Sequence, residues 1–209
     1  MAALVHLVRH AEVHNPDHVV YGRLPHYGLS DRGRRQAADA GRYMASRAVV
    51  AVWSSPLQRA LETGAAIAAP HQLPVRVHEG LSEWRLADAW EGLAWDDLPT
   101  LRPGELETYL SRPWDLPFSD ESLDELTDRM METLRELNDR HPEGDIVVVS
   151  HQDPVQVVRL ELSGKAPVLL HTDKPQHATV YSLRPGSSWS EAASYTPPEQ
   201  DSFPPLDTA

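Results

Sequence analysis

Short apolar runs alternate with longer stretches of helical periodicity along most of the chain. Four apolar runs are predicted as strands, namely residues 3–8, 49–53, 74–78 and 146–150. The run at 146–150 is continuously apolar up to its last residue, which is typical of a central parallel strand. Two further runs, at 179–183 and 189–195, flank Pro185-Gly186 and predict a closing pair of strands.

Amphipathic stretches between these runs predict helices over residues 31–47, 56–69, 119–138 and 153–162. Ser30 is placed to cap the first helix. Ser55 is placed to cap the second, with Pro56 at the first helical position. Residues 9–30 hold several turn signals and are expected to form an ordered loop.

Strands that alternate with helices predict the α/β class, with a mostly parallel sheet flanked by helices on both faces. We expect a single domain over residues 1–195, interrupted by an irregular, partly helical insertion at about 84–118 that lies over the sheet face. The insertion is rich in tryptophan, and these side chains are expected to pack it onto the domain. Residues 196–209 are rich in proline and acids and are predicted to be a mobile tail.

The composition of the chain mainly excludes certain kinds of site and classes of protein. The 209 residues include no cysteine, which rules out disulfides and thiolate metal sites. A net charge of −12 argues against a general nucleic-acid binder, and the apolar runs are too short to span a membrane. The first apolar run lacks the flanks of a signal peptide, so a cytoplasmic protein is expected. The oligomeric state stays open, a homo-oligomer included.

Charged side chains gather where the predicted strands end. Arg9 and His10 follow the first strand, and His151 follows the fourth. Arg59 falls in the first turn of the helix after the second strand, where it opposes the helix dipole and would gain from a nearby anion. Ligands of open α/β sheets collect outside the carboxyl ends of the strands. We therefore expect these four side chains to share an anion pocket.

These residue types suit phosphoryl transfer. Arginine presents planar donors to phosphate oxygens, and a neutral imidazole can attack phosphorus. The leaving oxygen also needs a proton donor, for which Glu12, Glu83 and Glu91 are candidates. Glu83 follows the third predicted strand and can therefore approach the same rim of the pocket.

Five segments carry the most specific pattern of the chain. They are Leu7-Val8-Arg9-His10-Ala11-Glu12, residues 29–37, residues 54–63, Leu81-Ser82-Glu83 with Trp90-Glu91-Gly92, and Val149-Ser150-His151. In this order they resemble the motifs of the histidine phosphatase superfamily, which includes the cofactor-dependent phosphoglycerate mutases. The resemblance spans residues 4 to about 160 and implies a phosphoglycerate mutase-like fold.

The resemblance implies a role for each matching residue. His10 would be the nucleophile that becomes phosphohistidine, and Glu83 would protonate the leaving group and then deprotonate water. Arg9, Arg59 and His151 would hold the phosphoryl oxygens. No metal and no other cofactor is implied, because the cationic side chains take that place.

The first loop supplies further candidates, and two positions depart from the family pattern. Asn15 lies near a family asparagine that contacts phosphate, while Gly22 and Arg23 are placed to meet another anionic group of the substrate. Ala11 and Gln152 stand where the family usually has glycine. The methyl group of Ala11 is therefore expected where the backbone passes close to phosphate.

A metal site is the weaker interpretation of the same loop. His10, His14 and His18 recur at four-residue spacing, which on a helix would suggest metal ligands. Pro16 disfavours a helix there, so His14, His18 and His26 are expected to be exposed loop residues.

Together these observations predict a metal-independent phosphatase that hydrolyses a small phosphomonoester, a small phosphorylated metabolite, through phosphohistidine. Mutase-type transfer would favour further cations in the insertion, where only Arg85, Arg102 and Arg112 are found among many acids. A non-catalytic phosphate-binding or interaction module is the remaining alternative, suggested by the two departures from glycine.

Overall fold

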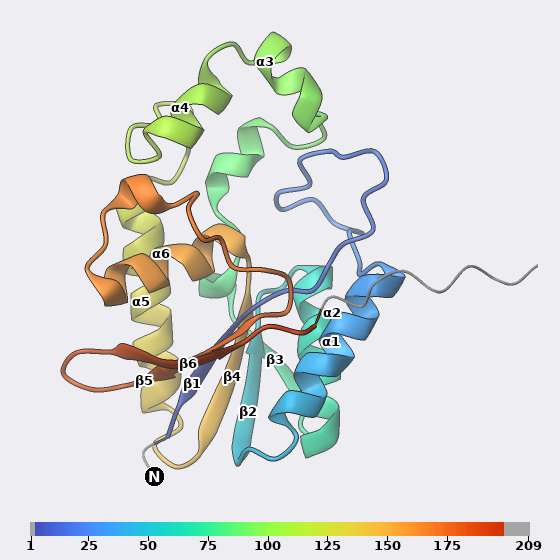
Figure 1. Cartoon of the computed structure of the whole chain (residues 1–209), viewed down its shortest axis with the longest axis vertical. Coiled ribbons are helices and arrows are strands. Elements are labelled where there is room, and N and C mark those ends of the chain that lie inside the picture. The colour runs from blue at the N-terminus through green and yellow to red at the C-terminus, as the bar shows by residue number, and fades with distance from the viewer. Residues whose placement is uncertain (1–2, 199–209) are drawn as a thin grey trace, which may run out of the picture.

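The computed structural model describes residues 3–198, which are built around one six-stranded sheet (Figure 1). The strands are β1 (Val5–Arg9), β2 (Val49–Ser54), β3 (Val75–Val77), β4 (Asp145–Ser150), β5 (Val180–Arg184) and β6 (Ser190–Tyr195). They lie in the order β3-β2-β4-β1-β5-β6, and the first four in this order are parallel. β5 pairs antiparallel with β1, and β6 pairs antiparallel with β5. The predicted mostly parallel sheet is confirmed.

The long helices cover both faces of this sheet. They are α1 (Asp31–Met44), α2 (Gln58–Ala68), α5 (Leu123–Asp139) and α6 (Gln152–Ser163). α1 packs beside α2 on one face, and α5 packs beside α6 on the other (Figure 1). This arrangement confirms the predicted α/β class with helices on both faces.

The central strand β4 shows why its sequence is continuously apolar. Ile146 and Val148 join the core beneath α5 and α6, whereas Val147 and Val149 join the core beneath α1 and α2. Successive side chains of a strand point to opposite faces, so a strand covered on both faces needs apolar residues at every position.

Backbone hydrogen bonds continue past the last residues of the strands. The His10 N–H donates to the Ser150 carbonyl (2.9 Å), and the Ser55 N–H donates to the Val149 carbonyl (3.0 Å). The residues that follow β1, β2 and β4 are therefore held in fixed positions at one edge of the sheet.

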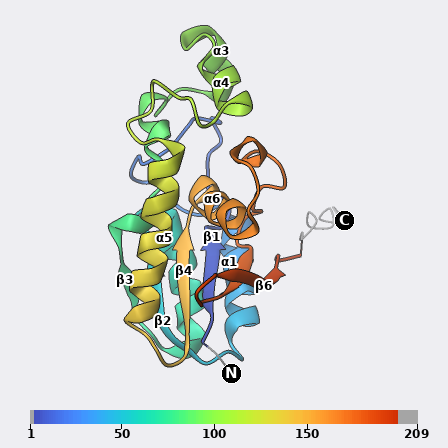
Figure 2. The same ribbon diagram turned by 90° about the vertical axis from the view of Figure 1, so that its left-hand side faces the viewer.

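The segment between β3 and α5 folds into short helical turns. They are 3₁₀ turns at Glu79–Leu81, Arg85–Ala89 and Trp95–Asp97, then α3 (Leu98–Leu101) and α4 (Glu105–Ser111). Figures 1 and 2 place α3 and α4 beyond the carboxyl ends of the strands, so the predicted position over the sheet face is wrong. The Val20 N–H donates to the Leu93 carbonyl (2.8 Å), and the Gly92 N–H donates to the Val20 carbonyl (2.9 Å). This pairing with the first loop holds the insertion above the sheet edge.

The start of α2 also differs from the prediction. The helix begins at Gln58 with Leu57 as its N-cap residue, so Ser55 is not the cap and Pro56 is not helical. The Ser55 hydroxyl accepts a hydrogen bond from the Leu57 N–H (3.3 Å) and also lies 2.7 Å from His151 Nε2. Ser55 therefore bonds both to the turn before the helix and across the sheet edge.

α5 begins at Leu123 instead of residue 119, because Ser122 and Glu125 form a reciprocal capping box. α1 ends at Met44, three residues before the predicted end at 47. Of the predicted mobile tail at 196–209, residues 199–209 lie outside the described residues.

Candidate active site

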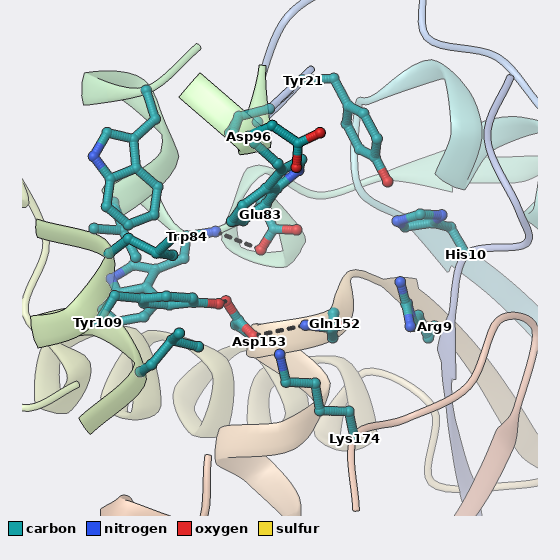
Figure 3. Close-up of a pocket in the computed structure, with 17 residues that line it drawn as sticks. Arg9, His10, Tyr21, Glu83, Trp84, Asp96, Tyr109, Gln152, Asp153 and Lys174 are labelled. Carbon is teal, nitrogen blue, oxygen red and sulfur yellow. Dashed lines mark hydrogen bonds between the residues drawn. The ribbon is translucent and has the colours of Figure 1, made fainter. Parts of the chain in front are cut away.

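A pocket of about 550 Å³ opens at the carboxyl ends of β1 and β4 (Figure 3). Arg9 and His10 line it from the end of β1, and Gln152 and Asp153 line it from the first turn of α6. The loop after β1 and the insertion supply most of the remaining wall. The pocket therefore lies where the α/β topology predicts a ligand site.

His10 is held in one tautomer. Its Nδ1 lies 2.7 Å from the backbone carbonyl of Ala11, which can only accept a hydrogen bond, so Nδ1 carries the proton. Burial, together with the nearby charge of Arg59, lowers the pKa of His10 well below its usual value. The imidazole is therefore neutral, with its lone pair on Nε2. A lone pair on a fixed ring nitrogen is what nucleophilic attack requires.

Unpartnered donors surround this histidine. Among the described residues, Arg9 Nε, Arg59 Nε and His151 Nδ1 are buried without a hydrogen-bond partner. His151 is held by Ser55 at its other nitrogen, and its ring lies 5.2 Å from that of His10 between centroids. Buried donors without partners are costly, and an anion with several oxygens would satisfy them.

Arg59 is fully buried although it stands in the first turn of α2. One terminal nitrogen donates to the Gly22 carbonyl (2.6 Å), and the guanidinium lies 4.7 Å from the centre of the Tyr21 ring. The first loop therefore fixes the direction of the guanidinium. This geometry accounts for an arginine at a helix end whose dipole disfavours cations.

Glu83 lines the opposite side of the pocket (Figure 3). One carboxyl oxygen accepts a hydrogen bond from the Trp84 N–H (2.9 Å), and the other lies 3.9 Å from His151 Nδ1. Burial, with a further contribution from the charge of Asp153, raises the pKa of Glu83 from 4.5 to about 7. A carboxyl group with this pKa can both give and take a proton near neutral pH.

The family model of the histidine phosphatase superfamily (branch 1) matches residues 5–195. The chain belongs to this superfamily. It is 41% identical over 168 residues to the uncharacterised protein Rv0525 of Mycobacterium tuberculosis, which covers 77% of this chain and 79% of that protein. It is 30% identical over 164 residues to phosphoserine phosphatase 1 of Hydrogenobacter thermophilus, with 76% and 75% covered.

Solved structures of similar proteins share the fold. YhfR of Bacillus stearothermophilus superposes with a TM-score of 0.83 at 21% identity, over 92% of this chain and 96% of that one. The mycobacterial glucosyl-3-phosphoglycerate phosphatase Rv2419c, solved with VO3, superposes with a TM-score of 0.79 at 24% identity, over 93% and 98%. The histidine phosphatase fold that the motifs implied is therefore confirmed.

The other candidate proton donors occupy different places in this member of the histidine phosphatase superfamily. Glu91 accepts a hydrogen bond from the backbone N–H of Arg23 and so fixes the first loop. Glu12 accepts hydrogen bonds from Ser30 (2.6 Å) and Arg32 (3.1 Å) at the start of α1. Neither carboxylate lines the pocket, whereas Glu83 does.

The first-loop candidates are separated by the structure. Gly22 lines the pocket, and its carbonyl holds Arg59. The Arg23 backbone is held by Glu91, and its side chain is not among the groups that line the pocket. Both polar atoms of the Asn15 amide bond to the backbone of Val19, at 2.9 and 3.2 Å. Asn15 therefore shapes the loop instead of reaching the pocket, contrary to the expectation of a phosphate contact.

The two departures from the family pattern are accommodated differently. Ala11 is fully buried in the core beneath α1 and α2, and its N–H donates to the Thr63 hydroxyl (3.0 Å). Ala11 therefore packs in the core and does not line the pocket. Gln152 lines the pocket, and its amide donates to Asp153 (3.3 Å).

Sequence reasoning missed three polar groups around the pocket. Arg9 is 2.9 Å from His177 Nε2, and the His177 ring lies 5.8 Å from that of His10 between centroids. Asp153 and Lys174 line the pocket itself. His177 and Lys174 precede β5, and only the antiparallel direction of β5 brings them to this edge of the sheet. That direction left no signal in the local sequence. Asp153 lies two residues after His151 and could have been found from that spacing.

Residues 3–198 contain no cluster of three or more histidine and acidic side chains arranged to hold a metal ion. His14, His18 and His26 are exposed on the first loop, as expected. Within the same residues, no helix combines the length and apolar character that crossing a membrane requires.

Proposed function

We propose that this protein hydrolyses phosphomonoesters through a phosphohistidine formed on His10, without a metal. One observation carries the proposal: His10 presents an Nε2 lone pair beside three buried donors that have no partner, on Arg9, Arg59 and His151. A phosphoryl group would satisfy these donors and place its phosphorus next to the nucleophile. The phosphatase names of several relatives support the same class of reaction.

The first step transfers the phosphoryl group to the enzyme. His10 Nε2 forms a bond to phosphorus while the ester P–O bond breaks on the opposite side. The protonated Glu83 carboxyl gives its proton to the leaving oxygen, so the alcohol departs neutral. Arg9, Arg59 and His151 would spread the negative charge of the phosphoryl oxygens in the transition state.

The second step returns the enzyme to its starting state. The Glu83 carboxylate takes a proton from a water molecule, whose oxygen attacks phosphorus as the P–N bond to His10 breaks. Inorganic phosphate leaves, and Glu83 is protonated again. A pKa of about 7 suits a group that acts first as an acid and then as a base.

Hydrolysis is favoured over mutase-type transfer by the charge of the insertion. A mutase has to retain a bisphosphate, yet Arg85, Arg102 and Arg112 do not line the pocket. Arg102 donates to the Ala89 carbonyl (3.3 Å), and Arg112 pairs with an acid on the protein surface. A non-catalytic binding module is less favoured, because it would not require a free imidazole nitrogen and a carboxyl of raised pKa in one pocket.

The direct test is to trap the intermediate. The wild type, incubated briefly with a phosphomonoester labelled on phosphorus and quenched in base, is expected to carry acid-labile label on His10. The His10→Ala variant should carry none and should lose phenyl phosphate hydrolysis by about a thousandfold or more. His14→Ala, which removes an exposed imidazole of the same loop, is the matched control and should behave as wild type. Full activity in His10→Ala, or an unlabelled but active wild type, would overturn the mechanism.

A further inference from the structure

The wall of the pocket opposite His10 is apolar and aromatic. Its members are Val20, Trp84, Leu86, Trp90, Trp95, Leu106, Tyr109 and Leu110. Most of them come from the insertion, which closes over the sheet edge (Figures 1 and 3). A leaving group that points away from His10 would therefore contact rings and aliphatic side chains.

The side-chain polar atoms of Trp84, Trp90 and Tyr109 are already engaged by the protein. The Trp84 indole N–H donates to the Glu121 carbonyl (2.8 Å), and the Trp90 indole N–H donates to a Glu105 carboxyl oxygen (2.7 Å). The Tyr109 hydroxyl donates to Asp153 at 2.9 Å. These aromatic residues consequently offer a ligand mainly their ring surfaces, and few new hydrogen bonds.

Trp95 stands at the mouth of the pocket. Its side chain is 40% exposed, and its ring lies edge-on to that of Trp90, with centroids 6.2 Å apart. An exposed indole that borders a cavity can gain burial when a flat apolar group enters. The fully buried Trp84 and Trp90 cannot gain in this way.

The charges of the pocket are divided between its two ends. Arg9 lines the His10 end, and Arg59 is near enough for its charge to lower the pKa of His10. Farther out, the carboxylates of Asp96 and Asp153 line the pocket and Lys174 is the remaining cation. Figure 3 shows the Lys174 side chain on the side of Asp153, so an anion drawn to Lys174 would also approach the Asp153 carboxylate. A further anionic group on a substrate would therefore meet two carboxylates, of Asp96 and Asp153, and a single lysine in this part of the pocket.

We infer that the substrates are phosphomonoesters of uncharged, ring-bearing or apolar alcohols, and that the pocket discriminates against substrates with a further carboxylate or phosphate. A volume of about 550 Å³ has room for a phosphoryl group together with a ring system. Trp95 is the specificity-determining residue for the ring, and Asp96 is the residue that repels the further anion. The inference rests on the proposed phosphatase function.

Three aryl phosphates test this inference with similar leaving groups: phenyl phosphate, naphthyl phosphate, and phenyl phosphate with a carboxymethyl group on the ring. The methylene group insulates the phenol from the carboxylate, so reactivity changes little. We expect kcat/KM to be about tenfold higher for the naphthyl ester than for the phenyl ester. We expect it to be about tenfold lower for the carboxymethyl ester. Equal values for all three esters, or a preference for the carboxymethyl ester, would overturn the inference.

Variants assign the effect to the wall. Trp95→Ala should abolish the naphthyl preference, because kcat/KM should fall more for the naphthyl ester than for phenyl phosphate. Trp114→Ala is the matched control, because Trp114 is an exposed tryptophan of the same insertion that does not line this pocket. Asp96→Asn should raise kcat/KM for the carboxymethyl ester relative to that for phenyl phosphate. A Trp114→Ala variant that loses the naphthyl preference as Trp95→Ala does would contradict the assignment.

Binding separates this inference from the proposed function. The corresponding phenyl, naphthyl and carboxymethylphenyl phosphonates cannot be hydrolysed, so their Kd values require no catalysis. Tightest binding of the naphthylphosphonate and weakest binding of the carboxymethyl compound would support the pocket chemistry even if wild type hydrolysed none of the esters. In that outcome the phosphatase proposal would fail alone. Equal Kd values for the three phosphonates would overturn the inference, whether or not the wild type hydrolyses the esters.

Discussion

Glu83 owes its raised pKa to its surroundings, and one neighbour can be changed without removing a hydrogen-bond acceptor. Asp153→Asn removes a negative charge but keeps an oxygen for the Tyr109 hydroxyl, which donates to Asp153 in wild type. Since the Asp153 charge raises the pKa of Glu83, the variant should lower it. The acid form of Glu83 would then be lost at lower pH. We expect the basic limb of the kcat/KM profile to move to lower pH, with activity at pH 8 reduced by about threefold to tenfold.

Two further variants control this measurement. Glu83→Gln should lose the basic limb altogether, together with about a hundredfold to ten-thousandfold of the rate. Asp115→Asn changes an exposed acid that pairs with Arg112 and should leave the profile where it is in wild type. A profile unchanged in Asp153→Asn would show that Asp153 does not set the pKa of Glu83.

Single residues were predictable where a strand end or a motif marks them. His10, Arg9 and His151 directly follow or end buried parallel strands, and the structure brings them together. Asn15 was misplaced because its amide finds partners four residues away, in the backbone of its own loop. An asparagine that bonds to its own loop cannot be told apart, in the sequence, from one that contacts a ligand.

Helix α5 contributes to the site through one side chain that the sequence did not single out. Arg129 donates to the carbonyls of Gly80 (2.8 Å) and Ser82 (3.0 Å), and its fork also binds Glu121 at 2.6 and 2.9 Å. These contacts fasten the turn that leads to Glu83. Arg129 is thus a positioning residue that acts through the backbone beside Glu83, the proposed proton donor.

Arg129→Lys keeps the charge but loses the fork, so the partly buried carbonyls of Gly80 and Ser82 lose donors. We expect the free energy of unfolding to fall by about 1–3 kcal/mol in urea titrations. We also expect kcat to fall more than KM changes, most for esters with poor leaving groups, which depend on the proton from Glu83. Arg140→Lys alters a half-exposed pair with Glu136 near the other end of α5. That variant should change stability by no more than about 0.5 kcal/mol. If Arg129→Lys is destabilised but its kcat is unchanged, Arg129 contributes to stability and does not position Glu83.

At the scale of elements, periodicity located the long helices, and the first residue of α1 was predicted correctly. The first residues of α2 and α5 were not. Ser55, which looked like a cap, contacts His151 across the sheet edge. α5 begins only after Ser122, because the reciprocal hydrogen bonds of Ser122 and Glu125 satisfy the first backbone donors of the helix.

At the scale of the whole molecule, the alternation of strands and helices was sufficient for the fold class. Sheet order and strand direction were not, because they depend on pairing between distant segments. β5 lies antiparallel beside β1, and this brings His177 to Arg9. The insertion likewise reaches the sheet edge through a backbone hydrogen bond between Val20 and Leu93, and no local sequence pattern predicts this contact.

The same architecture buries several imidazoles and so predicts how stability depends on pH. Burial lowers the pKa values of His6, His10, His151 and His177, the last from 6.5 to about 3. In the unfolded chain these groups titrate near their ordinary value of about 6.5. Below that pH the unfolded chain binds more protons than the folded protein, so unfolding becomes more favourable as the pH falls.

The raised pKa of Glu83 acts in the opposite direction. Between pH 4.5 and about 7 the folded carboxyl holds a proton that the unfolded chain has lost. The contribution of Glu83 to the free energy of unfolding therefore falls as the pH rises.

Four histidines outweigh one carboxyl, so the free energy of unfolding should rise with pH up to about 6.5. Each proton not balanced by another contributes up to about 1.4 kcal/mol per pH unit. Urea unfolding at pH 5, 6, 7 and 8 measures this slope. His177→Asn should make the slope below pH 6.5 shallower, whereas His14→Asn, on the exposed loop, should leave it unchanged; a flat profile in wild type would contradict the account.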